Sequence, residues 1–111
     1  ISEALSAGSD VLLRVDVQGA ATVKRLIPQA VTIFIAPPSR AVLLGRLRAR
    51  GGDTPEQVQC RLDTAMAELE RACEFDYVVV NYEDCLDQTV ATVQAIILAS
   101  KCRTGRQPVL V

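Results

Sequence analysis

Residues 30–36 (AVTIFIA), with Pro37 and Pro38 directly after them and Ser39 next, decide the fold class. The first part is a short, β-branched, apolar run, which is typical of a buried strand. The two prolines end it, because proline has no N–H to give to a sheet. Ser39 can then cap a helix whose leucines share one face as far as Arg50. This stretch therefore predicts a strand that leads directly into a helix.

Two further segments, one on each side of this unit, also have the composition of buried strands: residues 11–17 (VLLRVDV) and 76–80 (DYVVV). Helical spacing of apolar residues follows each predicted strand. After the last strand, Leu86, Val90, Val93 and Ile97 predict the apolar face of a helix at 84–100. Thr54, followed by Pro55 and Gln57, is a strong helix start. Alternating strands and helices are typical of an α/β fold. We therefore predict a parallel sheet of three strands flanked by helices. A complete domain of this type would have more strands, so we expect the chain to be a fragment.

The composition excludes several classes of protein. Half of the residues are hydrophobic, and 12 basic residues nearly balance 13 acidic ones, which argues against disorder and against attraction to nucleic acid or acidic membranes. The apolar runs are too short to span a bilayer, so we expect a soluble protein, and the cysteine usage described below indicates a reducing, intracellular compartment. Histidine is absent, which excludes a Ser-His-Asp triad and a Cys/His zinc site. The four cysteines form no C-x-x-C pair, and we expect reduced, partly buried thiols.

A basic cluster surrounds the helix break at residues 51–53 (GGD). Arg46 and Arg50 lie four residues apart and share a helix face, while Arg61 lies on the next helix. Guanidinium groups can bind phosphate oxygens bidentately, so these three around one point would suit a polyphosphate. A solvated basic helix face would have the same spacing and is the alternative interpretation.

Several segments of the chain occur in guanylate kinases in the same order and at similar spacings. They are VLLRVDVQGA at 11–20, IFIAPPS at 33–39, RLRARG at 46–51, Arg61-Leu62 with AMAEL at 65–69, and FDYVVVN at 75–81. Over roughly residues 1–100 the chain thus resembles the C-terminal part of a guanylate kinase, an enzyme that transfers a phosphoryl group from ATP to GMP. The resemblance implies a partial P-loop-kinase-type parallel sheet within residues 1–102, an arginine lid at about 46–61 between two helices, and a loose tail at 103–111.

The resemblance also implies roles for side chains on the ATP side. Arg46 and Arg50 match lid arginines that bind the ATP phosphates, and Arg61 matches one that bridges donor and acceptor phosphates, so all three are predicted to be catalytic. An arginine in such a role is worth roughly 10³–10⁵ in rate. Asn81 matches a residue that closes a strand near the adenine, and an ordinary turn residue is the alternative.

On the GMP side, Asp16 matches the carboxylate that accepts hydrogen bonds from guanine, and Gln18 lies in the adjoining turn. Both have a structural alternative: Asp16 as a strand-end residue that holds a loop, and Gln18 with Gly19 as a simple turn. The resemblance implies that Mg²⁺ arrives with ATP and has no dedicated site in this chain.

Two departures from the family pattern matter. Arg14 stands where most members have an aspartate that helps to organise Mg²⁺ and substrate. In this the chain resembles the plant organelle branch, which points to a plastid or a mitochondrion as alternatives to the cytoplasm. No G-x-x-x-x-G-K-[ST] loop is present to cradle the β-phosphate. We therefore expect the chain by itself to be inactive.

Three alternatives compete with a guanylate kinase. The first is a non-catalytic, guanylate-kinase-like interaction module of a membrane-associated scaffold protein; such modules usually lack the lid arginines, which are all present here. The second is another nucleoside-monophosphate kinase, against which Asp16 within VDVQGA argues. The third is a non-functional remnant, which the sequence immediately upstream would distinguish from an enzyme. The sequence carries no signal of oligomeric state.

Overall fold

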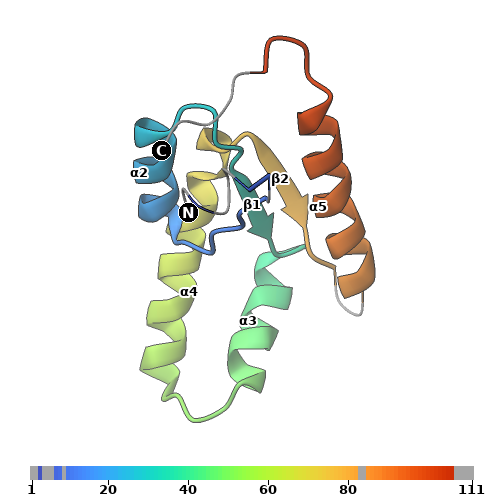
Figure 1. Ribbon diagram of the computed structural model, residues 1–111. Helices are drawn as coiled ribbons and strands as arrows, with labels where there is room; N and C mark the ends of the chain where they lie inside the picture. The colour runs from blue at the N-terminus through green and yellow to red at the C-terminus, as the bar shows by residue number, and fades with distance from the viewer. Residues whose placement is uncertain (1–2, 4–6, 9, 83–84, 107–111) are drawn as a thin grey trace.

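The computed structural model describes residues 3, 7–8, 10–82 and 85–106. Helices and strands alternate along the chain, and Figure 1 shows the helices arranged around two central strands. Of the predicted tail, residues 104–105 form a turn, and residues 107–111 lie outside the described part. The elements in chain order are α2 (Val17–Leu26), β1 (Ile33–Ala36), α3 (Arg40–Ala49), α4 (Pro55–Glu70), the short 3₁₀ helix η1 (Ala72–Glu74), β2 (Tyr77–Val80) and α5 (Leu86–Lys101).

Strands β1 and β2 pair in parallel, as an α/β fold requires. Ile33 is the partner of Tyr77 at one end, and Ala36 is the partner of Val80 at the other. Both strands were predicted from their apolar, β-branched composition, and both predictions are confirmed. The chain between them runs through α3 and α4, which is the helical crossover that parallel neighbours need.

The third predicted strand, residues 11–17, does not form in the structure. Residues 11–16 have no regular secondary structure, and Val17 already belongs to α2. Leu12 and Leu13 are 76% and 48% exposed, so this apolar run is not buried as predicted. The physical reason is that a strand exists only where a neighbour accepts and donates its backbone hydrogen bonds. Within the described residues, β1 and β2 pair only with each other.

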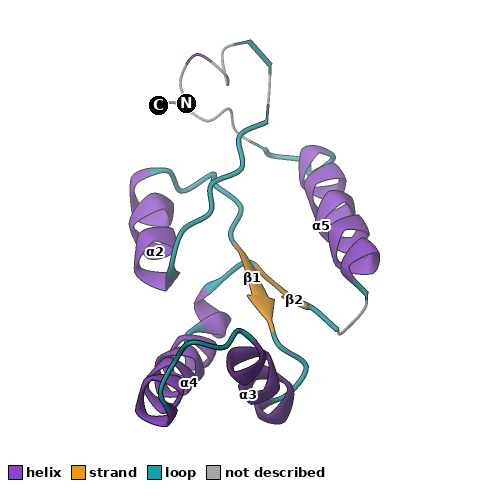
Figure 2. Ribbon diagram, turned by 90° about the horizontal axis from the view of Figure 1, so that it is seen from below, coloured by secondary structure: helices purple, strands orange, loops and turns teal. Residues whose placement is uncertain are grey.

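Helices α3 and α4 form an antiparallel hairpin whose starts agree with the sequence. The hydroxyl of Ser39 accepts from the N–H of Val42 at 3.1 Å and caps α3. Thr54 and Gln57 form the predicted capping box, with bonds of 2.8 and 3.2 Å, and cap α4. Figure 2 shows the two helices side by side on one side of the sheet, with α5 on the other.

The buried core is small and is centred on Leu62 of α4, which is 1% exposed. Burying a leucine side chain completely stabilises a fold by about 1.5–3 kcal/mol. The predicted apolar face of α5 is only partly correct, since Leu86 and Val90 are 66% and 47% exposed while Thr89 is buried. The other buried apolar residues are Val17, Ala20, Ala36, Val58 and Val79.

The structure also bears on the sequence-based expectations about thiols and membranes. All four cysteines are free, as predicted. Cys85 is half-buried, but Cys60, Cys73 and Cys102 are exposed, so the predicted partial burial is wrong for these three. Within the described part of the chain, no helix is both long enough and apolar enough to cross a bilayer.

Candidate functional site

The carboxyl ends of the two strands meet at Asn81. Its backbone N–H donates to the carbonyl oxygen of Ala36 at 2.8 Å, which continues the pairing of the strands one residue beyond β2. Asn81 is half-buried at this edge of the sheet. In open α/β sheets, ligands bind outside the carboxyl ends of the strands. The residue that was predicted to lie near adenine therefore stands at the edge where this class of fold binds ligands.

Arg46, in the last turn of α3, reaches the same edge. Its Nη2 donates to the carbonyl oxygen of Asn81 at 2.9 Å, across 35 positions in the sequence. The contact arises because Ser39 starts α3 directly after the carboxyl end of β1, so α3 runs from the edge at which Asn81 lies. Both residues were predicted to bind ATP, and the structure brings them together, although no motif predicted the contact itself.

Thr89 of α5 completes this group, and sequence reasoning missed it. Its hydroxyl lies 2.9 Å from Oδ1 of Asn81 and 3.3 Å from the carbonyl oxygen of Cys85. Thr89 is buried, at 9% exposed. The signal that could have found it is its spacing, since it lies three residues after Leu86 and four before Val93, on an apolar face. We call Arg46, Asn81 and Thr89 the carboxyl-end cluster.

The other two predicted catalytic arginines lie along the hairpin of α3 and α4. Arg50 follows the last residue of α3 and is exposed. Arg61, on α4, forms an ion pair with Asp53, with Nε 3.1 Å from Oδ2. The contacts of Arg46 and Arg61 thus differ, and convergence of the three guanidinium groups on one phosphate stays a prediction.

Gly51 and Gly52 connect the two helices with backbone φ angles of 70° and 79°. Side chains other than glycine rarely adopt this left-handed conformation. The sequence predicted a break in the helix here, and the structure confirms it. A pair of residues of this kind suits a hinge, because the backbone can change its angles with little steric cost.

The predicted GMP residues lie at the start of α2. Asp16 caps this helix, with Oδ1 accepting from the N–H of Gly19 at 2.6 Å. The structural alternative for Asp16 was a strand-end residue that holds a loop, but no strand forms here and the residue caps a helix instead. The cap uses one of the two carboxylate oxygens. Asp16 and Gln18 line a cavity of about 350 Å³, with Glu68 of α4 among the residues that face them. Sequence reasoning did not include Glu68.

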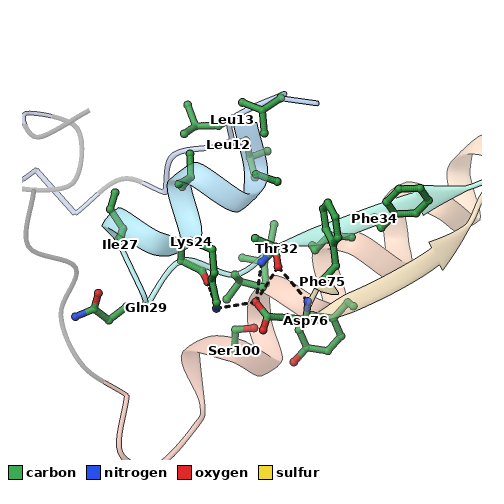
Figure 3. Close-up of a pocket in the computed structure, with 18 of the residues that line it drawn as sticks. Leu12, Leu13, Lys24, Ile27, Gln29, Thr32, Phe34, Phe75, Asp76 and Ser100 are labelled. Atoms are coloured by element: carbon green, nitrogen blue, oxygen red, sulfur yellow. Dashed lines mark hydrogen bonds and ion pairs between the residues drawn. The ribbon is translucent and has the colours of Figure 1, made fainter. Parts of the chain in front are cut away.

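A larger cavity, of about 990 Å³, lies at the opposite end of the strands. Apolar side chains from the segment before α2, from α2, β1 and α5 line most of it, and Figure 3 shows Leu12, Leu13 and Ile27 on its wall. Asp16 lines this cavity as well, but none of the predicted ATP residues does. The predicted phosphate-binding residues and this larger cavity are therefore at different places in the fold.

A polar group in that cavity joins α2 to the beginnings of β1 and β2. Oδ2 of Asp76 accepts from the Lys24 ammonium at 2.9 Å, from the Thr32 N–H at 2.9 Å and from the Thr32 hydroxyl at 3.1 Å. Lys24 also donates to the carbonyl oxygen of Ala30 at 2.6 Å. Figure 3 shows these side chains in contact. We call Lys24, Thr32 and Asp76 the amino-end cluster.

The surroundings of Asp76 lower the pKa of its carboxyl group. Partial burial by itself raises this pKa, but the hydrogen bonds from Thr32 and Lys24 and the positive charge of Lys24 together outweigh it. The ionised form is therefore stabilised in the folded protein.

Comparison with known proteins places the chain. Residues 1–100 match the sequence model of the guanylate kinase family. The chain belongs to the guanylate kinase family. It is 51% identical over 106 residues to the guanylate kinase of Thermus thermophilus, which covers 96% of this chain and 47% of that protein. It is 45% identical over 108 residues to the guanylate kinase of Desulfitobacterium hafniense, covering 97% and 53%.

The match to the guanylate kinase of Neisseria gonorrhoeae is similar, with 46% identity over 102 residues, 92% of this chain and 49% of that protein. The chain thus spans about half the length of the curated guanylate kinases that it matches. The family resemblance inferred from the sequence segments is confirmed. The likeness of Arg14 to the plant organelle branch stays a prediction.

Proposed function

We propose that this chain carries the arginine-bearing part of an ATP:GMP phosphotransferase. The observation that supports this most strongly is the contact between Arg46 and Asn81 at the carboxyl end of the sheet. Two residues that the family resemblance assigns to ATP lie in contact, at the edge where open α/β sheets bind ligands. Phosphoryl transfer needs little covalent help from the protein and depends mainly on positioning and positive charge.

The bond to Asn81 anchors Arg46 but leaves other N–H donors of its guanidinium group available. Its Nη2 makes the bond to Asn81 O, and a guanidinium group has further N–H donors in a planar fork. These donors suit the oxygens of a polyphosphate, to which a fork can bind bidentately. Arg46 would thus fix the ATP phosphates relative to the strands, while Asn81 lies close to the base.

Arg50 and Arg61 would act through movement of the hairpin at about residues 46–61. In the present conformation Arg61 is neutralised by Asp53. Closure about the glycines at 51 and 52 would exchange that carboxylate for phosphate oxygens of the two substrates. Charge that develops on the transferring group strengthens such contacts in the transition state, which is the condition for faster chemistry.

On the acceptor side, the free oxygen of Asp16 would bind the guanine of GMP. Oδ1 is engaged by the N–H of Gly19, so Oδ2 is the atom with capacity to accept from the N1–H and amino group of guanine. Gln18 lies on the same cavity. The helix cap and the ligand contact are compatible, because they use different oxygens of one carboxylate.

Magnesium would enter as part of the ATP substrate. Among the described residues, no group of three or more Asp, Glu or Cys side chains could hold a metal ion. Arg14, where most of the family has an aspartate, is exposed. The proposal therefore needs no metal ligand from the described residues, because the nucleotide phosphates would carry the cation.

The test is a chimera in which this chain replaces the aligned segment of the Thermus thermophilus guanylate kinase. A coupled assay of ADP release with GMP should show turnover on the order of 1–100 per second. A folded chimera that does not bind ATP or GMP and does not transfer phosphate would contradict the proposal and favour the interaction module. The matched control is Arg48→Ala, because Arg48 lies on α3 between the two assigned arginines and has no assigned role. This variant should leave turnover unchanged.

A further inference from the structure

The hydroxyl group of Thr89 has a single proton and two acceptors within reach. Oδ1 of Asn81 lies at 2.9 Å and the carbonyl oxygen of Cys85 at 3.3 Å. Hydroxyl donors prefer distances near 2.7–2.8 Å, so the amide is the better acceptor. The Cys85 carbonyl also accepts from the N–H of Thr89 at 3.1 Å within α5. The proton of Thr89 therefore goes to Asn81.

This bond determines which way the side chain of Asn81 faces. With Oδ1 toward α5, the amide nitrogen faces away from Thr89. The backbone of Asn81 is engaged as well, since its N–H donates to Ala36 and its carbonyl accepts from Arg46. Among the contacts that the described residues make, none uses Nδ2 of Asn81, whereas every other polar atom of the residue has a partner.

An asparagine amide in one orientation distinguishes adenine from guanine. On its Watson–Crick edge adenine has an amino donor beside a ring-nitrogen acceptor, and an amide complements the pair with the second lone pair of its oxygen and with its nitrogen. On the same edge guanine has a carbonyl oxygen in place of the amino group and an N–H in place of the ring acceptor, so the amide must turn over to match it. An amide that turns freely would serve both bases, and a fixed one serves only one.

We propose that Thr89 is a positioning residue that holds the Asn81 amide in the orientation that selects adenine over guanine in the phosphate donor. The inference rests on the proposed role of Asn81 beside the base of ATP. The burial of Thr89, at 9% exposed, keeps water from competing for the bond. Thr89 itself need not touch the nucleotide, since it acts through Asn81.

The test compares Thr89→Val with Thr89→Ser in the chimera. Valine keeps the shape but removes the hydroxyl, and serine keeps the hydroxyl but removes a methyl group. Loss of one hydrogen bond of this kind should raise the KM for ATP about three- to tenfold with Thr89→Val. The preference for ATP over GTP should fall by a similar factor, while the KM for GMP should stay the same. Thr89→Ser should resemble the parent in all three quantities.

Two controls separate positioning from packing. Asn81→Ala should lose the same ATP preference, and adding Thr89→Val to it should cause no further loss, because the two act as one unit. Equal changes for ATP and GMP, an unchanged ATP-to-GTP ratio, or a serine variant as poor as the valine variant would each overturn the inference. If Thr89→Val does not fold, an unchanged ratio in Asn81→Ala would overturn it as well.

The outcome is distinguishable from failure of the proposed function. Calorimetric titration with ATP and with GTP measures the preference even in a chimera that does not turn over. A chimera that transfers phosphate but shows no effect of Thr89→Val would contradict this inference alone. A chimera that prefers ATP in binding, loses that preference with Thr89→Val and transfers nothing would contradict the proposed transfer alone.

Discussion

The two ends of the sheet carry polar clusters that differ in what their charged groups contact. In the amino-end cluster, one oxygen of Asp76 accepts three hydrogen bonds, and its cationic partner also donates to a backbone carbonyl. In the carboxyl-end cluster, the guanidinium of Arg46 and the amide of Asn81 each keep donors in reserve. The comparison teaches that a carboxylate paired with a cation inside the fold holds elements together, whereas an arginine bonded to a neutral carbonyl keeps its charge for a ligand.

The largest effect should come from Arg50, on the hairpin that extends from the carboxyl end. In the chimera, Arg50→Ala should lower turnover by roughly two to four orders of magnitude, because the arginine meets charge that develops during transfer. GMP affinity should change little. Steady-state kinetics of Arg50→Ala and of the control variant Arg48→Ala measure both quantities. Undiminished turnover would mean that Arg50 is only part of a solvated helix face.

A variant of Asp16 tests whether a residue that caps a helix can also bind the nucleotide. Asp16→Asn should weaken GMP binding roughly ten- to a hundredfold and leave ATP binding unchanged, because the amide presents a donor where guanine requires an acceptor. Asparagine caps helices as well as aspartate does, so stability should be preserved. Calorimetric titration with each nucleotide measures the difference. Equal losses for the two nucleotides would leave only the capping role.

The amino-end cluster should affect stability and not catalysis. Asp76→Ala in the chimera should reduce the free energy of unfolding by about 1–3 kcal/mol, since it leaves the N–H of Thr32 without its acceptor. The KM values for ATP and GMP should not move. Denaturant titration with kinetics on the same samples is the measurement, and a selective loss of ATP affinity would erase the distinction between the two ends.

The same cluster predicts a pH dependence with a definite sign. The pKa of Asp76 is lower in the folded protein than its ordinary value near 4, so the unfolded chain binds the proton more readily. The stabilisation is complete above that ordinary value and is lost as the pH falls through the lower folded pKa. Denaturant titrations from about pH 7 down to about pH 2.5 should show this loss in the parent chimera. They should show less of it in Asp76→Asn, and an identical pH dependence in the two would contradict the prediction.

The smallest effect should come from Asp53, the partner of Arg61. Asp53→Asn frees the guanidinium for phosphate, so ATP should bind more tightly. Because the Arg61 side chain is 49% exposed, solvent weakens the pair to about 1 kcal/mol, which limits the gain to roughly fivefold. Titration with ATP at low and at high salt measures it, since screening should reduce the gain. Weaker ATP binding in Asp53→Asn would mean that Asp53 positions Arg61 instead of competing for it.

Sequence reasoning succeeded where the determinants are local. The caps at Ser39 and Thr54 use atoms within three residues of each other, and the strand composition of β1 and β2 is continuous. Individual site residues were named as members of a family pattern, and that family is confirmed. The contact between Arg46 and Asn81 could not be predicted, because it joins residues 35 positions apart.

Thr89 was missed for a related reason. A hydroxyl on an apolar helix face is visible in the sequence, but its hydrogen-bond partner is not. The sequence-based prediction also oriented the helix by its larger apolar residues. In the structure Leu86 and Val90 are exposed, so α5 is turned differently from what their hydrophobicity predicts.

The sequence by itself determined the alternation of strands and helices, the starts of α3 and α4, the glycine break between them and the family, because each depends on neighbouring residues or on a linear pattern. Only the tertiary structure decided that residues 11–16 are not a strand and that Arg46, Asn81 and Thr89 meet at one edge of the sheet. A strand and a polar cluster both need partners from distant parts of the chain. Composition can favour such partnerships, but only packing forms them.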